Sequence, residues 1–328
     1  MKQECLARAH VASLISALLM VESAAAQTAP PSTPPPRYAA AAPFNPQSAP
    51  ASAAQLASMV PIPAGTYPIG SPAQHALADR AAMPAHRVSL AAFRIDRTEV
   101  TNAQFAEFLN ALPMKPSGTA IAGAVGSAHI PADARWMFQS GRRRSPYAII
   151  ELDDENALIG IHDGRFAPNP RYGEHPVTET TWAGALAYCK WRGARLPTEV
   201  EWEAAARGSA GRTFPWGEAM PTTELAVIGR RTGETLPVGS RPKGATPDGL
   251  LDMAGSLSEW TSTLDRPYPY RAEDGREDPT LPGDRIVRGG DHVFNDGNER
   301  LTTWNRTIWS RNPAAGHRHI GFRCAAEA

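Results

Sequence analysis

A short stretch near the end of the chain, RGGDHVFNDGNER at residues 288–300, gathers side chains that could do chemistry. Asp291, His292 and Glu299 supply an imidazole and two carboxylates, which are common ligands of a harder metal such as iron(II). The same residues, together with Asn295, could line a polar cleft that recognises a peptide or small ligand. A third interpretation has Asp291 and Asn295 capping turns while His292 packs on an aromatic neighbour. The stretch by itself leaves all three open.

A second pair of histidines, His317 and His319, precedes the segment GFRC. In a strand, an i, i+2 spacing puts both side chains on one face, where they could bind a metal. No third ligand is evident nearby in the sequence. A solvated or hydrogen-bonded role is therefore favoured for the pair.

A first helix is predicted to begin after Thr101. Thr101 with Gln104 matches a capping box, in which the two residues satisfy backbone donors of the first turn. Pro113 is the expected stop. The apolar residues between them fall at helical spacing: Phe105, Phe108, Leu109 and Leu112.

Two more helices are predicted within one long segment, residues 174–208. Thr181 is expected to cap the first, which Gly193 ends. Thr198 with Glu201 forms a second capping box, and this helix should end near Gly208.

Turn residues punctuate the rest of the chain. Asp163-Gly164 lies between IGIH and RFAP, which is a hairpin signal. Few long periodic segments remain. The pattern predicts an irregular α+β domain with much coil, held together by its aromatic residues.

Charge and composition exclude several classes of protein. Lys plus Arg and Asp plus Glu both number 33, so the chain lacks the basic excess typical of nucleic-acid or anionic-membrane binding. Hydrophobic residues make up 42%, enough for a sizeable core. The common nucleotide, zinc-protease and serine-hydrolase motifs are missing from the sequence.

Residues 1–26 match a secretory signal peptide. Lys2 and Arg8 charge its start, an apolar run covers 11–21, and small residues at 24–26 suit cleavage before Gln27. The apolar run is shorter than the ~20 residues that span a membrane. We therefore expect a periplasmic or secreted protein without a membrane span.

Residues 27–57 are rich in Pro, Ala, Ser and Gln, which is typical of a semi-extended linker. From residue 58 the composition becomes globular and no second linker follows. Residues 58–328 are therefore interpreted as one domain.

Six segments follow one another in a fixed order along this domain: RIDRTEVTNAQFAEFLN (94–110), EHPVTETTWAGALAYCKWRGARLPTEVEWEAAARG (174–208), FPWG (214–217), DGLLDMAGSLSEWTS (248–262), RIVRGG (285–290) and GFRCA (321–325). Their order resembles the family of formylglycine-generating enzymes, or sulfatase-modifying factors, over essentially the whole domain. The resemblance implies the family's fold, a C-type-lectin-like variant with little regular secondary structure, which agrees with the coil-rich prediction.

The resemblance also exposes a departure at the expected active site. Oxidase members of the family use two cysteines shortly after the GG pair to hold copper(I), for which soft thiolates are suited. Phe294 and Glu299 appear at these positions here. Ordinary formylglycine generation is therefore disfavoured. An iron site remains an alternative, because the family includes iron-dependent hercynine-type oxygenases and cysteine-free members implicated in pyoverdine maturation. Against this alternative, the hercynine-type enzymes carry their iron histidines in an additional domain that is not recognisable in this sequence.

A structural calcium site is a further implication of the resemblance. Family members often bind calcium with an Asn where Ser256 stands and with a Glu at the position of Glu259. A hydroxyl in place of the amide should weaken the site, because calcium prefers six to eight hard oxygen ligands. The alternative role for Glu259 is a buried carboxylate that accepts backbone hydrogen bonds. Trp260 matches a tryptophan near the family's cleft, although such residues are more often core.

The mature chain would keep two cysteines, Cys189 and Cys324, while Cys5 would leave with the signal peptide. An oxidising compartment permits a bond between them, but the sequence cannot pair them. Free buried thiols are the default expectation.

Together these features predict an exported maturation factor or oxidase that acts on a peptide or peptide-derived substrate. In this hypothesis Asp291, His292 and Glu299 are catalytic, and Trp260, Arg306 and Asn295 contact the substrate. The competing hypothesis is a binding module without enzymatic activity that uses the same cleft. Metal content would separate the two, since iron or copper would favour an oxidase.

Overall fold

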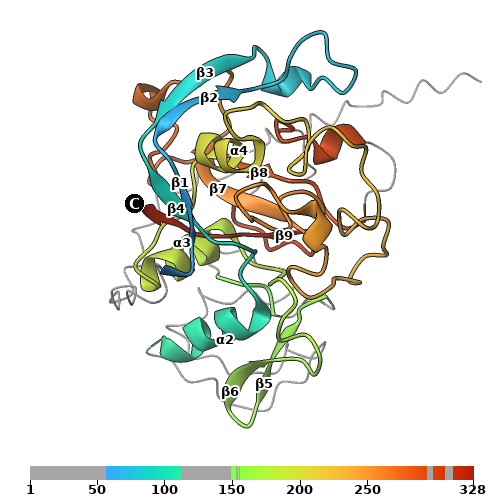
Figure 1. The fold of residues 1–328 in the computed structure, drawn as a ribbon. Coiled ribbons are helices and arrows are strands. Elements are labelled where there is room, and N and C mark those ends of the chain that lie inside the picture. The colour runs from blue at the N-terminus through green and yellow to red at the C-terminus, as the bar shows by residue number, and fades with distance from the viewer. Residues whose placement is uncertain (1–56, 113–148, 153, 155, 294–297, 307–312) are drawn as a thin grey trace, which may run out of the picture. The chain divides into compact units, whose positions relative to one another are not determined.

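The computed structural model describes residues 57–112, 149–152, 154, 156–293, 298–306 and 313–328 (Figure 1). Its strands are short and form small sheets. One sheet has the order β1-β4-β10 and another the order β8-β7-β9, while β2-β3 and β5-β6 pair alone. The strands are β1 (Val60–Ile62), β2 (Gly65–Ile69), β3 (His86–Leu90), β4 (Phe93–Ile95), β5 (Ile159–His162), β6 (Arg165–Pro168), β7 (Ser258–Leu264), β8 (Arg285–Arg288), β9 (Ile320–Gly321) and β10 (Ala325–Glu327).

Three α-helices accompany the sheets in the described part of the chain, and their starts confirm the predicted caps. α2 (Asn102–Ala111) and α4 (Glu199–Arg207) both begin with capping boxes, and Thr181 caps α3 (Trp182–Trp191). Each cap satisfies backbone N–H groups that the first helical turn leaves without partners. Short 3-10 segments also occur: η1 (Arg80–Ala82), η3 (Pro242–Gly244), η4 (Ala272–Asp274) and η5 (Asn298–Leu301). Among the described residues, no helix is both long and apolar enough to cross a membrane.

The predicted hairpin at Asp163-Gly164 is also confirmed. β5 and β6 pair antiparallel across these two residues, whose φ angles are 49° and 72°. Two successive positive φ angles are what a tight two-residue hairpin turn needs. The hairpin packs beside α2, away from β7, β8 and α4 (Figure 1).

The central sheet and α4 position the segment that follows β8. β7 pairs antiparallel with β8 and parallel with β9, so chain segments around residues 260, 287 and 320 lie side by side (Figure 1). α4 packs against β7 and β8, and Trp202 on α4 and Trp260 on β7 are both buried.

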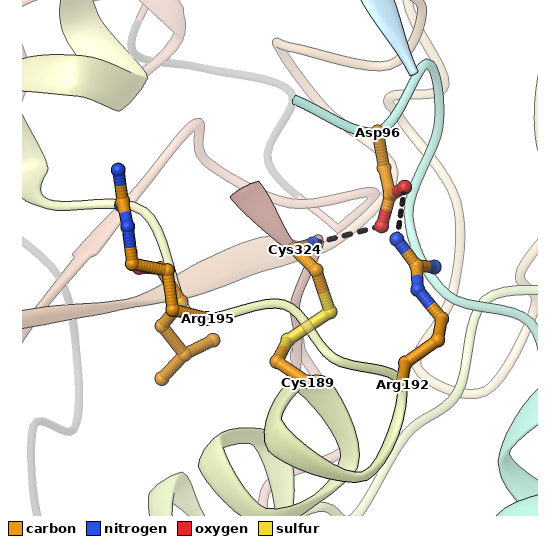
Figure 2. The surroundings of a disulfide bond; sticks show 6 residues. Asp96, Cys189, Arg192, Arg195 and Cys324 are labelled. Atoms are coloured by element: carbon orange, nitrogen blue, oxygen red, sulfur yellow. Dashed lines mark hydrogen bonds and ion pairs between the residues drawn. A yellow bond between two sulfur atoms is a disulfide. The ribbon is translucent and has the colours of Figure 1, made fainter. Parts of the chain in front are cut away.

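The default expectation of free thiols was wrong, because Cys189 and Cys324 form a disulfide (Figure 2). The chain after α3 pairs with β10 through Arg195 and Ala325, which brings the two Cα atoms to 5.6 Å. This separation lies within the ~7 Å that a disulfide can bridge. Asp96 lies beside the bond and accepts a hydrogen bond from the Cys324 N–H (Figure 2).

Candidate functional site

Two glycines turn the chain from β8 into the candidate site. Gly289 and Gly290 have φ angles of 101° and 69°, which favour glycine. A Cβ atom at Gly289 would lie 3.2 Å from the Trp202 ring, and one at Gly290 would lie 2.9 Å from the Arg300 carbonyl oxygen. Asp291 and His292, which follow this turn, are both fully buried.

His292 is held in one orientation by the chain before β7. The Ser256 carbonyl oxygen lies 3.0 Å from Nδ1 of His292 and also accepts the His292 backbone N–H at 2.8 Å. A carbonyl can only accept, so Nδ1 carries the proton and Nε2 presents a lone pair. Nε2 is buried and has no hydrogen-bond partner among the described residues.

His319 and Asp291 lie against this imidazole. The rings of His292 and His319 have centroids 5.4 Å apart and meet edge to face. Nδ1 of His319 is 3.6 Å from a carboxylate oxygen of Asp291, and the His317 ring lies 5.3 Å from that of His319. We call Asp291, His292, His317 and His319 the histidine cluster.

The cluster is electrically neutral at its three rings near pH 7. Burial lowers the pKa of His292, His317 and His319, and neighbouring positive charge lowers it further. For His319 the pKa falls to about 4, through burial first and then through the other two histidines. Neutral imidazoles are the form that accepts protons.

An open pocket of about 430 Å³ lies next to the cluster. The two share one loop: the Arg230 backbone N–H donates to the His292 carbonyl oxygen at 2.9 Å, and the Thr232 hydroxyl lies 3.5 Å from Nε2 of His319. The pocket is lined by Arg171, Tyr172, His175, Arg230, Gly233, Glu234 and Thr235.

The histidine pair predicted from its spacing is arranged differently in the structure. His317 and His319 do not share a strand, because β9 begins only at Ile320. The Ile320 N–H donates to the His317 carbonyl oxygen and the His319 N–H donates to Nδ1 of His317, which closes a turn instead. That turn directs His319 toward His292, a partner 27 residues earlier in the chain.

The other predicted site residues fall in different surroundings. Glu299 is exposed on η5, and Asn295 lies outside the described residues. Trp260 is fully buried and donates to the Thr180 carbonyl oxygen at 3.2 Å. Arg306 is buried as well, paired with Glu199 at 2.8 Å and stacked over the Tyr268 ring.

The described residues do not fit a resident copper or iron ion. Copper(I) favours thiolates, but Cys189 and Cys324 are bonded to each other. Iron would need convergent ligands, and among the described residues no three His, Cys, Asp or Glu side chains are arranged to hold one metal. In the cluster, Nδ1 of His317 accepts a backbone N–H and Nδ1 of His319 faces Asp291.

The predicted calcium site also conflicts with the contacts of its residues. Arg323 binds both carboxylate oxygens of Glu259 at 2.7 Å, and Trp202 donates to one of them at 2.9 Å. The Ser256 hydroxyl donates to Glu99 at 3.2 Å. A guanidinium thus occupies the positions that a calcium ion would need, and Glu259 accepts side-chain rather than backbone hydrogen bonds.

Comparison with known proteins places this chain within a family. Residues 45–328 match the sulfatase-modifying factor enzyme 1-like domain. The formylglycine-generating enzyme of Streptomyces coelicolor is 34% identical over 327 residues, covering 88% of this chain and 95% of the relative. The hercynine oxygenase of Mycolicibacterium smegmatis is 34% identical over 246 residues, which cover 70% of this chain and only 53% of that protein.

A solved structure supports the same fold. PvdO from Pseudomonas aeruginosa matches with a TM-score of 0.52 and 23% identity, over 82% of this chain and 94% of that one. This likeness concerns the fold and confirms the predicted class, an α+β formylglycine-generating-enzyme fold of C-type-lectin-like type. The chain belongs to the family of sulfatase-modifying factor enzyme 1-like proteins.

Proposed function

We propose that this family member is an exported maturation enzyme or oxidase that acts on a peptide or peptide-derived substrate beside the histidine cluster. One observation carries the proposal: Nε2 of His292 is buried and has no partner among the described residues, while His292 is hydrogen-bonded to a loop that lines an open pocket. A neutral imidazole in this position can remove a proton from a bound substrate at neutral pH.

The cluster divides the work of proton transfer among its members. His292 accepts the proton at Nε2, because Ser256 holds the proton on Nδ1. A carboxylate oxygen of Asp291 lies 3.6 Å from Nδ1 of His319, and its negative charge stabilises the positive charge that then develops on the neighbouring rings. As an oxidase, the protein would pass two electrons and two protons from the substrate to dioxygen, which gives hydrogen peroxide.

Export is part of the proposal and can be tested separately. The sequence of residues 1–26 supports it, and so does the bond between Cys189 and Cys324, since disulfides persist in oxidising compartments. We expect the exported protein to begin at Gln27. N-terminal sequencing of protein from the periplasm or medium tests this, and recovery of full-length chain only from the cytoplasm would contradict it.

The catalytic test compares three single substitutions in protein exported from its own signal. His292→Ala and His319→Ala should each reduce turnover by about 100-fold or more, the usual contribution of a positioned base. His162→Ala, on the exposed end of β5, is the matched control. Turnover is followed as dioxygen consumption and as mass change in a peptide mixture, and wild-type rates in both cluster variants would reject the assignment.

The same assay separates the alternatives. Saturable peptide binding without turnover would favour a binding module on this scaffold. A cysteine-containing sulfatase peptide tests ordinary formylglycine generation, for which we expect neither thiol loss nor aldehyde, because the two cysteines of the mature chain are joined to each other.

A further inference from the structure

The pocket beside the histidine cluster lies between two loops, and hydrogen bonds hold both in place. The side-chain amide of Asn102 donates to the carbonyl oxygens of Tyr172, His175 and Pro176 at 3.0, 3.1 and 3.3 Å. Asn102 is fully buried, so this contact holds residues 172–176 in one conformation. A preformed wall of this kind lowers the cost of ordering a ligand site.

The second loop is tied to the first. The Val238 N–H donates to the Glu174 carbonyl oxygen at 2.9 Å, and Nδ1 of His175 lies 2.9 Å from the Thr235 hydroxyl. The pocket walls therefore come from separate chain segments that hydrogen bonds hold together.

The backbone of Arg171 has an unfavourable conformation that lowers the stability of the fold. Its φ angle is 74°, in the left-handed region that glycine adopts readily and other residues do not. The side chain is exposed and lines the pocket, so packing does not explain its presence. Strained residues retained at a ligand site often serve the ligand.

Arg230 supplies a second guanidinium to the same pocket. Its Nε donates to the Glu234 carbonyl oxygen, which fixes the plane of the group. Burial lowers the pKa of His175 in the pocket and of His292 in the cluster, and the positive charge of Arg230 lowers each pKa further, so Arg230 lies within electrostatic reach of both. Two guanidiniums and one carboxylate leave the lining positively charged.

We infer that this pocket binds a carboxylate, namely the free carboxyl terminus of a peptide-derived substrate, through Arg171 and Arg230. A planar guanidinium matches a carboxylate in shape and charge and binds it through paired N–H donors. The inference rests on the proposed function and names its substrate class. A substrate anchored there lies against the loop that also contacts His292 and His319.

The experiment measures binding rather than turnover, so its failure is distinct from failure of the proposed reaction. N-acetyltyrosine and N-acetyltyrosine amide, which differ in the carboxylate alone, are titrated into the full exported chain by calorimetry. The carboxylate should bind at least about tenfold more tightly, as expected for a charge-assisted contact. His292→Ala should leave this preference intact.

Substitutions assign the preference to the pocket. Arg171→Gly and Arg230→Gln should each weaken binding of N-acetyltyrosine by about tenfold and leave binding of the amide unchanged. Arg171→Gly should also leave the melting temperature equal to or higher than that of the wild type, because glycine relieves the strained backbone. Arg231→Gln, on the same loop but outside the lining, is the control and should bind as the wild type does.

The possible results are decisive in both directions. Selective loss of carboxylate binding in a folded Arg171→Gly variant supports the inference. Equal affinity for the two probes, no saturable binding of either, or wild-type binding in both arginine variants overturns it.

Discussion

Arg288 and Asp291 lie three positions apart in the chain, yet they enter regions of opposite character. Arg288 points into a network in which buried charges are paired: it bonds Glu203, which also accepts the Gly70 N–H at 2.8 Å and Arg207 at 2.9 Å. Asp291 faces the partly buried imidazole of His319, whose pKa burial lowers to about 4, so that this ring carries no charge near neutral pH. Within three residues the chain thus passes from a buried charge that is paired with an opposite charge to the surroundings of an imidazole that is kept neutral.

This difference supports the distinction we propose between a region that stabilises the fold and a region that takes part in the reaction. Around α4, Oε2 of Glu199 accepts from Arg306 at 2.8 Å and from Tyr268 at 3.2 Å, and Oε1 accepts from Arg306 at 3.3 Å, so both oxygens already have partners. In the histidine cluster, Nε2 of His292 keeps its lone pair unused among the described residues. A group whose bonding capacity is filled by the fold is poorly placed for catalysis, whereas an unfilled one next to a pocket is well placed.

The largest expected effect comes from breaking the paired region. Glu203→Gln removes the countercharge of Arg288 and Arg207 without changing the side-chain volume much. A buried charge left unpaired typically costs about 3–5 kcal/mol. We expect a loss of that size in the free energy of unfolding, measured by urea denaturation.

The matched control for Glu203 is an exposed pair of the same chemistry. Glu224 pairs with Lys243 at 2.7 Å, but both side chains are 71% exposed. Glu224→Gln should therefore cost less than about 1 kcal/mol. Similar costs for the two substitutions would mean that burial of the α4 network does not set its contribution.

Removal of the disulfide should have the next largest effect. Cys189→Ala with Cys324→Ala opens a link between residues 135 positions apart, for which a cost of about 2–4 kcal/mol is typical. Because the bond lies between α3 and β10, we expect binding of N-acetyltyrosine in the pocket to be unaffected once the protein is folded. A variant with normal stability, or with altered binding, would contradict this separation.

Acid should affect the histidine region in particular. The folded-state pKa of His319 is lowered from 6.5 to about 4, so as the pH falls through this window the unfolded chain takes up a proton before the folded chain does. Stability contributed by the neutral imidazole is complete above pH 6.5 and is lost toward pH 4, with a slope of at most about 1.4 kcal/mol per pH unit for each group.

The comparison of wild type with His319→Asn isolates this effect from other titrating groups. Asp291, His292, His317 and Arg318 face or adjoin the His319 ring and remain in the variant. The stability difference between the two proteins should change between pH 6.5 and pH 4 and stay constant above pH 7. A difference that does not vary with pH would show that His319 titrates normally in the fold.

Sequence patterns identified the parts of this fold that are decided locally. The caps at Thr101, Thr181 and Thr198 and the turn at Asp163-Gly164 depend on hydrogen bonds and backbone angles within a few residues, and all were predicted correctly. Strands as short as β9, with two residues, leave no period to detect. They form because a distant strand supplies their hydrogen bonds.

The candidate site could be predicted only in part, because some of its contacts depend on segments that are distant in the sequence. Asp291 and His292 stand out because they follow a glycine pair, but the nearness of His319 depends on the parallel pairing of β7 with β9. The spacing of His317 and His319 suggested a strand, whereas a side-chain bond between them makes a turn. Arg171 gave no signal, because its importance lies in a backbone angle that the sequence does not reveal.

The smallest expected effect concerns calcium, and it tests whether Glu259 belongs to the paired region. Arg323 already fills both of its oxygens, so added calcium or a chelator should not change the melting temperature measurably. A functional site would behave differently, since a ligand at 100 times its Kd stabilises a protein by about 2.7 kcal/mol. A saturable rise in melting temperature would therefore require Glu259 to leave Arg323, and Glu259→Gln should abolish that rise. Without such a rise, Glu259 belongs to the paired region. Its oxygens are then already bonded to Arg323, as Glu203 is bonded to Arg288, and neither carboxylate is available to a ligand.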